Sequence, residues 1–99
     1  MEYEIRFAGP RVEKEFFKFI SRLNKKLQKR IYSSIIALSH NPRPPGKKFK
    51  FLETELPFYN YVAHYRLRIG DYRIFYDIDD ADKIVVLLAI ALKEKDIYK

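Results

Sequence analysis

A short hairpin constrains the fold of this chain more than any other stretch of its sequence. Residues 65–77 read YRLRIGDYRIFYD, two runs of alternating residues joined by Gly70-Asp71. A two-residue loop that begins with glycine is typical of a type II′ turn, because glycine accepts the positive φ required there. The stretch therefore predicts two antiparallel strands in which Arg68 lies opposite Arg73.

The two faces of this hairpin differ in character. Side chains alternate faces along a strand, so one face is apolar while the other gathers cations around little more than one carboxylate. The residues of this second face, called the arginine face below, are His64, Arg66, Arg68, Arg73, Phe75 and Asp77. Like charges opposite each other destabilise a sheet, so this pattern favours a polyanion site, with phosphate as the obvious anion. A solvated face on which the arginines spread apart is the alternative that the pattern leaves open.

Length and composition limit the class of protein. The 99 residues predict one domain, 1–99, with a modest core, and the lack of cysteine excludes thiol chemistry and disulfides. The longest apolar run, Ile84 to Leu92, has the length of a strand, and no signal peptide is visible. We therefore expect a soluble cytoplasmic protein with no membrane partner. The net charge of +7 favours an acidic partner, either nucleic acid or an acidic protein segment.

The first half of the chain has helical periodicity after a short strand. Residues 3–7 alternate like a strand, and an amphipathic helix is expected from about Pro10 to Leu23. Asn24 is a candidate N-cap for a second helix, because its side chain can accept a hydrogen bond from the first turn. The proline-rich stretch 41–46 must end that helix and form a stiff loop.

The second half reads as strands. A short edge strand is expected at 51–52 and a turn-rich connector at 53–57, before the hairpin and the apolar strand 84–92. Because helices and strands are segregated, the fold class is α+β. We expect an N-terminal strand, an antiparallel two-helix hairpin, and then a mainly antiparallel sheet of three to four strands. The helices should cover the apolar face of the sheet and leave the arginine face to solvent.

The residue types exclude several kinds of catalytic site. The sequence has no glycine-rich phosphate loop, no nucleophile elbow and no pair of histidines at metal-ligand spacing, so no cofactor is expected. Cations and tyrosines suit one reaction, transesterification within RNA, in which the 2′-hydroxyl attacks the adjacent phosphate and the 5′-oxygen leaves. A lysine with a lowered pKa or a tyrosine could share the proton transfers, because arginine is too basic. Tyr98 or Phe75 could stack on a single-stranded base.

Several stretches resemble the RelE/ParE toxin superfamily. They are Asn41-Pro42, Gly46-Lys47, residues 65–76 and Ile97-Tyr98, of which 65–76 is the most specific. The resemblance implies the RelE-like microbial RNase fold and a toxin of a type II toxin–antitoxin pair. RelE-type members cleave messenger RNA in the ribosomal A site by the 2′-hydroxyl mechanism. A RelB-like antitoxin wraps around the toxin and blocks it, and operator DNA is reached only through the antitoxin complex.

The resemblance also implies roles for single residues. Arg73 matches the arginine that stabilises the scissile phosphate, and Tyr98 matches the terminal tyrosine that orients or stacks on the RNA. Arg66 and Arg68 resemble a basic pair that contacts the phosphate and assists proton transfer. The contacts expected with messenger or ribosomal RNA, from the resemblance or from a place on the arginine face, are Lys47, Lys48, Lys50, His64 and Phe75.

The tail departs from the RelE pattern. RelE-type tails usually carry an arginine shortly before the tyrosine, to serve the leaving group, whereas residues 92–96 here read LKEKD. Lys93 or Lys95 is the expected substitute, although lysine lacks the planar fork of arginine. Two alternatives stay open. One is a ParE-like poison of DNA gyrase without nuclease activity, a branch that typically lacks the terminal tyrosine. The other is a catalytically weak member that only binds its antitoxin or nucleic acid.

Overall fold

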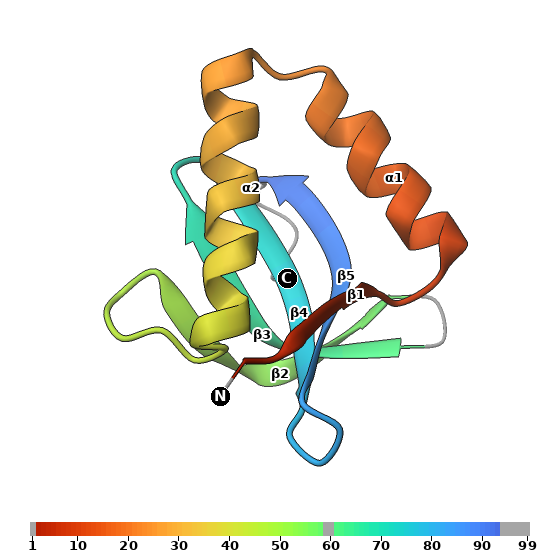
Figure 1. Ribbon diagram of the computed structural model, residues 1–99, viewed down its shortest axis with the longest axis vertical. Coiled ribbons are helices and arrows are strands. Elements are labelled where there is room, and N and C mark those ends of the chain that lie inside the picture. Colours follow the sequence, from red (N-terminus) through yellow and green to blue (C-terminus); the bar gives the residue numbers. More distant parts are fainter. Residues whose placement is uncertain (1, 59–60, 94–99) are drawn as a thin grey trace.

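The fold combines two helices with a mixed sheet (Figure 1). A computed structural model describes residues 2–58 and 61–93, without the side chains of residues 54, 55 and 58. The elements in chain order are β1 (Glu4–Phe7), α1 (Pro10–Ser21), α2 (Lys25–His40), β2 (Phe49–Phe58), β3 (Tyr61–Ile69), β4 (Tyr72–Asp79) and β5 (Ile84–Leu92). In this part of the chain the sheet has five strands in the order β1-β5-β4-β3-β2. The predicted α+β class, with strand, two helices and sheet in that order, is confirmed.

Both helices begin and pack as their sequences predict. Pro10 opens α1, where its missing N–H costs no hydrogen bond, and α1 ends at Ser21, two residues before the expected end. The Asn24 side chain caps α2 by accepting a hydrogen bond from the Leu27 N–H at 2.8 Å. The side chains that each helix buries against the sheet recur at helical spacing; they are Val12, Phe16 and Ile20 in α1, and Ile31, Ile35 and Leu38 in α2.

The hairpin has the predicted turn and register. Gly70 has a φ of +59°, the positive φ that the first position of a type II′ turn requires. Arg68 lies opposite Arg73, and Ile69 lies opposite Tyr72. The β3–β4 hairpin therefore places its cations as the alternation of the sequence indicated.

The N-terminal strand is the one parallel member of the described sheet. β1 pairs with β5 in parallel from Glu4↔Ile84 to Phe7↔Leu87, and the Ala8 N–H donates to the Leu87 carbonyl at 2.9 Å. This pairing joins the two ends of the described chain and makes β5 an interior strand. The helices bridge the two strands, because α2 contacts β1 and α1 contacts β5.

The prediction for β2 was wrong in its length. Residues 53–57 belong to a ten-residue edge strand and not to a connector. The register of β2 against β3 shifts between Phe51 and Leu56, which marks an irregularity of the β-bulge kind. Leu52, within this irregular stretch, and Leu56, at its end, pack into the same apolar cluster. Burial of these two side chains therefore keeps the segment in the sheet despite its polar and proline residues.

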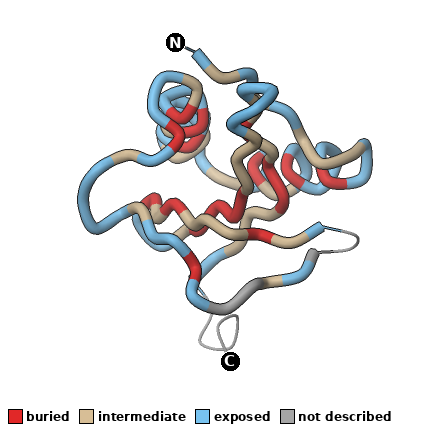
Figure 2. The backbone as a smooth tube through the Cα atoms, turned by 90° about the horizontal axis from the view of Figure 1, so that it is seen from below, coloured by how far each residue is buried: buried red, intermediate tan, exposed pale blue. Residues whose placement is uncertain are grey.

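The sheet buries side chains on both faces, and this corrects the expectation of a solvent-exposed arginine face. The main core joins the helices to the apolar face of β3, β4 and β5. A second cluster contains Leu52, Ala63, Phe75 and Leu88 and no helical residue. Figure 2 shows the buried positions along the sheet strands as well as on the helices. The arginine face is therefore partly an apolar core, and it is only partly available to a ligand.

Candidate functional site

The register of the sheet lines up the cations of the arginine face in two rows. Lys50, Arg66 and Phe75 are directly paired neighbours on β2, β3 and β4, and Arg68 is paired with Arg73 on the next row. Directly paired residues point to the same side of a sheet. Four cations from three strands therefore share one face: Lys50 on β2, Arg66 and Arg68 on β3, and Arg73 on β4.

Arg73 lies at the floor of this arrangement. It is 4% exposed, which contradicts the expectation of an exposed side chain. Its Nη1 donates to the carbonyls of Gly70 and Tyr72, both at 3.0 Å. The Arg73 guanidinium is thus held against the hairpin turn, and its substitution affects packing as well as charge.

Arg66 is the half-buried cation of the first row. Its Nε is buried and has no hydrogen-bond partner among the described residues. A buried donor without a partner costs on the order of 1–3 kcal/mol, a cost that a ligand oxygen at this position would remove. Arg66 therefore has the chemistry of an anion contact that is incomplete without its ligand.

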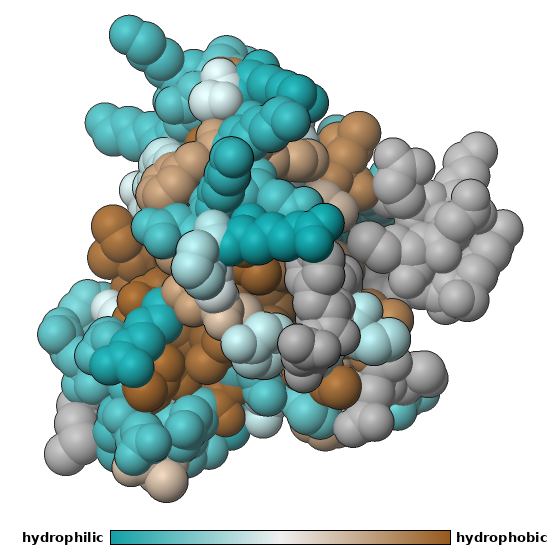
Figure 3. All heavy atoms as spheres, turned by 90° about the vertical axis from the view of Figure 1, so that its right-hand side faces the viewer, coloured by the Kyte–Doolittle hydropathy of each residue, from teal (hydrophilic) through white to brown (hydrophobic). Residues whose placement is uncertain are grey.

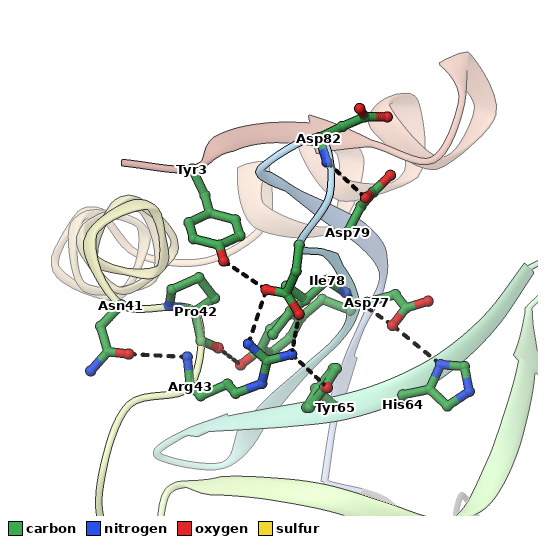
Figure 4. A network of polar contacts seen from close by, with 12 residues as sticks. Tyr3, Asn41, Pro42, Arg43, His64, Tyr65, Asp77, Ile78, Asp79 and Asp82 are labelled. Carbon is green, nitrogen blue, oxygen red and sulfur yellow. Dashed lines mark hydrogen bonds and ion pairs between the residues drawn. The ribbon is translucent and has the colours of Figure 1, made fainter. Parts of the chain in front are cut away.

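His64 and Asp77 mark the end of the arginine face away from the turn. Their side chains approach to 3.2 Å between Nδ1 and Oδ1, and Asp77 also accepts a hydrogen bond from its neighbour, the Ile78 N–H, at 2.9 Å (Figure 4). Both side chains are about one-third exposed. This contact orients the His64 imidazole. It also means that Asp77, the carboxylate of the arginine face, is paired with the histidine and not with the arginines.

The lysines lie at two margins of the site. Lys47, Lys48 and Lys50 are exposed where the loop after α2 enters β2. Lys93 is exposed at the end of β5, and its N–H donates to the Asp71 carbonyl at 2.6 Å. The hairpin turn thus accepts hydrogen bonds from both Arg73 and Lys93, and the structure brings these two predicted site residues together.

The predicted stacking residues and the second tail lysine are not found at the described site. Phe75 was expected to stack on RNA, but its ring is fully buried in the second cluster, so that assignment was wrong. Lys95 and Tyr98 lie outside the described residues. The described part of the site therefore supplies cations, and no aromatic ring of the arginine face lies open for stacking there.

A polar network that the sequence analysis missed holds the loop before the lysines (Figure 4). Arg43 donates to both carboxylate oxygens of Asp80, at 3.2 and 2.9 Å, and to the Tyr65 hydroxyl at 3.0 Å. Tyr3 donates to Asp80 at 2.6 Å, and the buried Tyr76 donates to the Pro42 carbonyl at 2.7 Å. The sequence signal that could have pointed to this network is the set of three aspartates within residues 79–82, but nothing in the sequence linked Asp80 to an arginine 37 residues away.

Charge pairing in this network changes the acidity of its members. Hydrogen bonds from Arg43 and then from Tyr3 lower the pKa of Asp80 to about 2. The Asp80 contact raises the pKa of the Arg43 guanidinium, and burial raises the pKa of the Tyr76 hydroxyl. Arg43 also lies over the Tyr65 ring, 5.2 Å from its centroid. These groups keep their charges fixed at neutral pH and position the loop; none of them is poised to exchange a proton.

The arrangement is suited to binding an anion with several oxygens. Cations on adjacent strands can bind successive oxygens of a phosphodiester and stabilise charge that develops on it.

Among the described residues, no group of three His, Cys, Asp or Glu side chains could hold a metal ion. None of the described helices is long and apolar enough to cross a bilayer.

Comparison with solved structures gives related folds. The chain is similar to a RelE–RelB complex from Pyrococcus horikoshii OT3, with a TM-score of 0.69 at 24% identity over 96% of this chain and 99% of that one. It is also similar to the toxin–antitoxin complex RelBE2 from Mycobacterium tuberculosis, at 0.65 and 22% over 93% and 99%. A double mutant of the E. coli toxin RelE in the free state gives 0.60 and 21% over 99% and 92%. At these identities the likeness establishes the fold.

Comparison with protein families identifies the chain. A search of the curated proteins gave no match. The family described as "ParE toxin of type II toxin-antitoxin system, parDE" matches residues 9–97, which include both helices and the whole arginine face. The match confirms the superfamily that the hairpin sequence indicated. The chain is a type II toxin of the RelE/ParE superfamily and belongs to its ParE toxin family.

Proposed function

We propose that this toxin is a ribosome-dependent endoribonuclease that cleaves messenger RNA in the A site. The observation that carries the proposal is the set of cations brought together on the arginine face by the register of β2, β3 and β4. In the proposed reaction the 2′-hydroxyl attacks the adjacent phosphorus, the bond to the 5′-oxygen breaks, and a 2′,3′-cyclic phosphate and a 5′-hydroxyl result. No metal ion is required for this transfer.

The residues divide into three roles in this proposal. Arg66 and Arg68 contact the phosphate, because they are partly exposed on the arginine face. Arg73 lies beneath and adds positive charge; its direct contact with the phosphate would require the guanidinium to become uncovered, since 4% of the residue is exposed. Lys93, or Lys95, serves the leaving 5′-oxygen, and Tyr98 positions the RNA. The exposed lysines Lys47, Lys48 and Lys50 contact the RNA backbone, as His64 does at the far end.

The proposed partners follow from the same assignment. The substrate is messenger RNA on the ribosome, and the toxin acts in the cytoplasm, where ribosomes are. A RelB-like antitoxin would neutralise the toxin, and the similar RelE structures include complexes with RelB. Operator DNA would be bound only through that complex.

A second candidate function is a ParE-like poison of DNA gyrase. It is favoured by the family match, which is to the ParE family. The tail sequence also fits it, because residues 92–96 contain no arginine. In that case the arginine face would contact protein or DNA without promoting cleavage.

One paired experiment separates the two functions. Wild-type toxin is added to a cell-free translation reaction, and a reporter message is mapped by primer extension with and without ribosomes; a supercoiling assay with purified gyrase runs in parallel. New 5′ ends inside codons that depend on ribosomes, with normal supercoiling, are the expected result. An intact message with trapped gyrase–DNA complexes would replace the proposal by the gyrase function.

A further inference from the structure

A pocket on the helix side of the sheet is separate from the apolar cluster of the arginine face. It has a volume of about 230 Å³ and is lined by residues of α2, β3 and the loop that joins α2 to β2. Figure 1 shows where these three segments lie in the fold. Its floor is aliphatic, formed by Leu38, Leu67 and Ile69, which belong to the main core. Ala37 and Pro44 add to its apolar lining.

One face of α2, together with the C-cap residue Asn41, supplies half of the described residues that line this pocket. Arg30, Ser34, Leu38 and Asn41 recur at intervals of three and four residues, the spacing at which helix side chains lie above one another. β3 supplies the opposite wall. A helix and an interior strand therefore supply the two walls of the pocket.

The charge around the pocket has one sign. Arg30, Lys48 and Arg68 are among the described residues that line it, and none of these described residues is acidic. Arg30 lies against the hairpin turn, because its Nη1 is 3.3 Å from the position that a Cβ on Gly70 would occupy. The pocket therefore combines an apolar floor with positive charge, which is the complement of an apolar side chain flanked by carboxylates.

The size and lining argue against other ligands. Sites for small molecules usually exceed about 300 Å³, so this pocket suits one or two side chains better than a cofactor. Bases of single-stranded RNA are bound by stacking on aromatic rings, and the part of the lining that the structure describes contains none. The exposed apolar surface on the α1 side of the molecule, visible between hydrophilic side chains in Figure 3, has no comparable ring of like charge to specify a partner.

We propose that this pocket receives an aliphatic side chain from an acidic segment of the antitoxin. The inference rests on the proposed toxin function for the identity of the partner. Arg68 lines the pocket and, by alternation along β3, belongs to the arginine face, so the two sites meet at this residue. An acidic segment seated here would neutralise Arg68 and Lys48, two of the proposed RNA contacts. Occupancy of the pocket and binding of RNA would therefore compete.

The test uses the full chain and a defined probe. The probe is a pentapeptide with a central leucine between two pairs of acidic residues, and its binding is followed through the methyl resonances of Leu38, Leu67 and Ile69. We expect these resonances to shift. The same peptide with alanine in place of leucine, or with lysine in place of the acidic residues, should shift them at least tenfold less at equal concentration.

Two pairs of variants on α2 make the result specific. Ala37→Trp fills the pocket and should abolish the shifts, whereas Ser33→Trp adds the same ring to an exposed position outside it. Arg30→Glu should weaken peptide binding roughly three- to tenfold, whereas Lys29→Glu, which reverses a neighbouring charge outside the pocket, should change it less than twofold. Thermal unfolding of each variant verifies that it is folded.

Three results would overturn the proposal. They are equal binding of the leucine and alanine peptides, peptide shifts that survive Ala37→Trp, and shifts of these methyl groups by a single-stranded RNA in place of the peptide. None of these results depends on message cleavage. If wild-type toxin left messages intact, the nuclease function would fail while the peptide experiment still decided the occupant of the pocket.

Discussion

At the scale of single residues, burial changes what a substitution at Arg73 measures. The guanidinium donates to two turn carbonyls and is almost wholly buried. We expect Arg73→Ala to lower the free energy of unfolding by about 1–3 kcal/mol, because those carbonyls lose a charged donor. Arg73→Lys, which keeps the charge, should lose less. Urea unfolding followed by circular dichroism measures both, and a wild-type midpoint for Arg73→Ala would show that the arginine does not hold the turn.

Asp80 should carry part of the acid sensitivity of the fold. Its pKa in the folded state, about 2, is below its ordinary value of 3.8, because Arg43 and Tyr3 donate hydrogen bonds to it. A carboxyl with a lowered pKa stabilises the fold above its unfolded pKa, and this contribution is lost as the pH falls through the folded value. We expect Asp80→Asn to be less stable than wild type at neutral pH and to lose less further stability between pH 3.8 and pH 2.

The control for this titration is Asp82→Asn. Asp82 lies in the same turn. In the described hydrogen bonds it takes part through its backbone N–H, which donates to the Asp79 carboxylate. Urea midpoints measured across this pH range compare the two variants. Parallel curves for wild type and Asp80→Asn would mean that the Arg43 contact does not stabilise the fold.

At the scale of elements, the hairpin turn depends on glycine. Gly70 has φ +59°, and a Cβ there would meet the Arg30 side chain at 3.3 Å. Because a β-branched residue is strained in this conformation, Gly70→Val should cost at least about 1–2 kcal/mol. Gly70→Asn should cost less, since asparagine is found at positive φ more often than β-branched residues are. The two urea midpoints test this, and equal losses would point to the Arg30 contact, and not to backbone strain, as the cause.

The elements that local sequence determines were predictable, and those that distant contacts determine were not. The Gly70-Asp71 turn fixed the register of β3 and β4, and the Asn24 cap fixed the start of α2. Nothing local in residues 53–57 indicated a strand, because their place in β2 depends on burial of leucines against β3 and β5. For the same reason alternation assigned Arg73 and Phe75 to the correct face but could not show that this face is partly covered.

At the scale of the whole molecule, the site joins segments that are far apart in the chain. The hairpin sequence grouped Arg66 with Arg73, but it could not show that Lys50, on β2, lies beside them. The network of Arg43, Asp80 and Tyr3, which ties the loop after α2 to the acidic turn and to the N-terminal segment, had no local signature. The sequence therefore indicated the chemistry of the arginine face. The way in which distant segments assemble around this face depends on tertiary packing.

The most direct test of the central claim is the rate of message cleavage on programmed ribosomes by wild type, Arg66→Ala and Lys29→Ala. Both substitutions remove one positive charge, but Arg66 lies on the arginine face and Lys29 on the exposed side of α2. Loss of a contact to the reacting phosphate should slow cleavage by Arg66→Ala roughly a hundredfold, with unchanged circular dichroism, while Lys29→Ala matches wild type. Equal rates for all three proteins would contradict the assignment of the arginine face to the reacting phosphate.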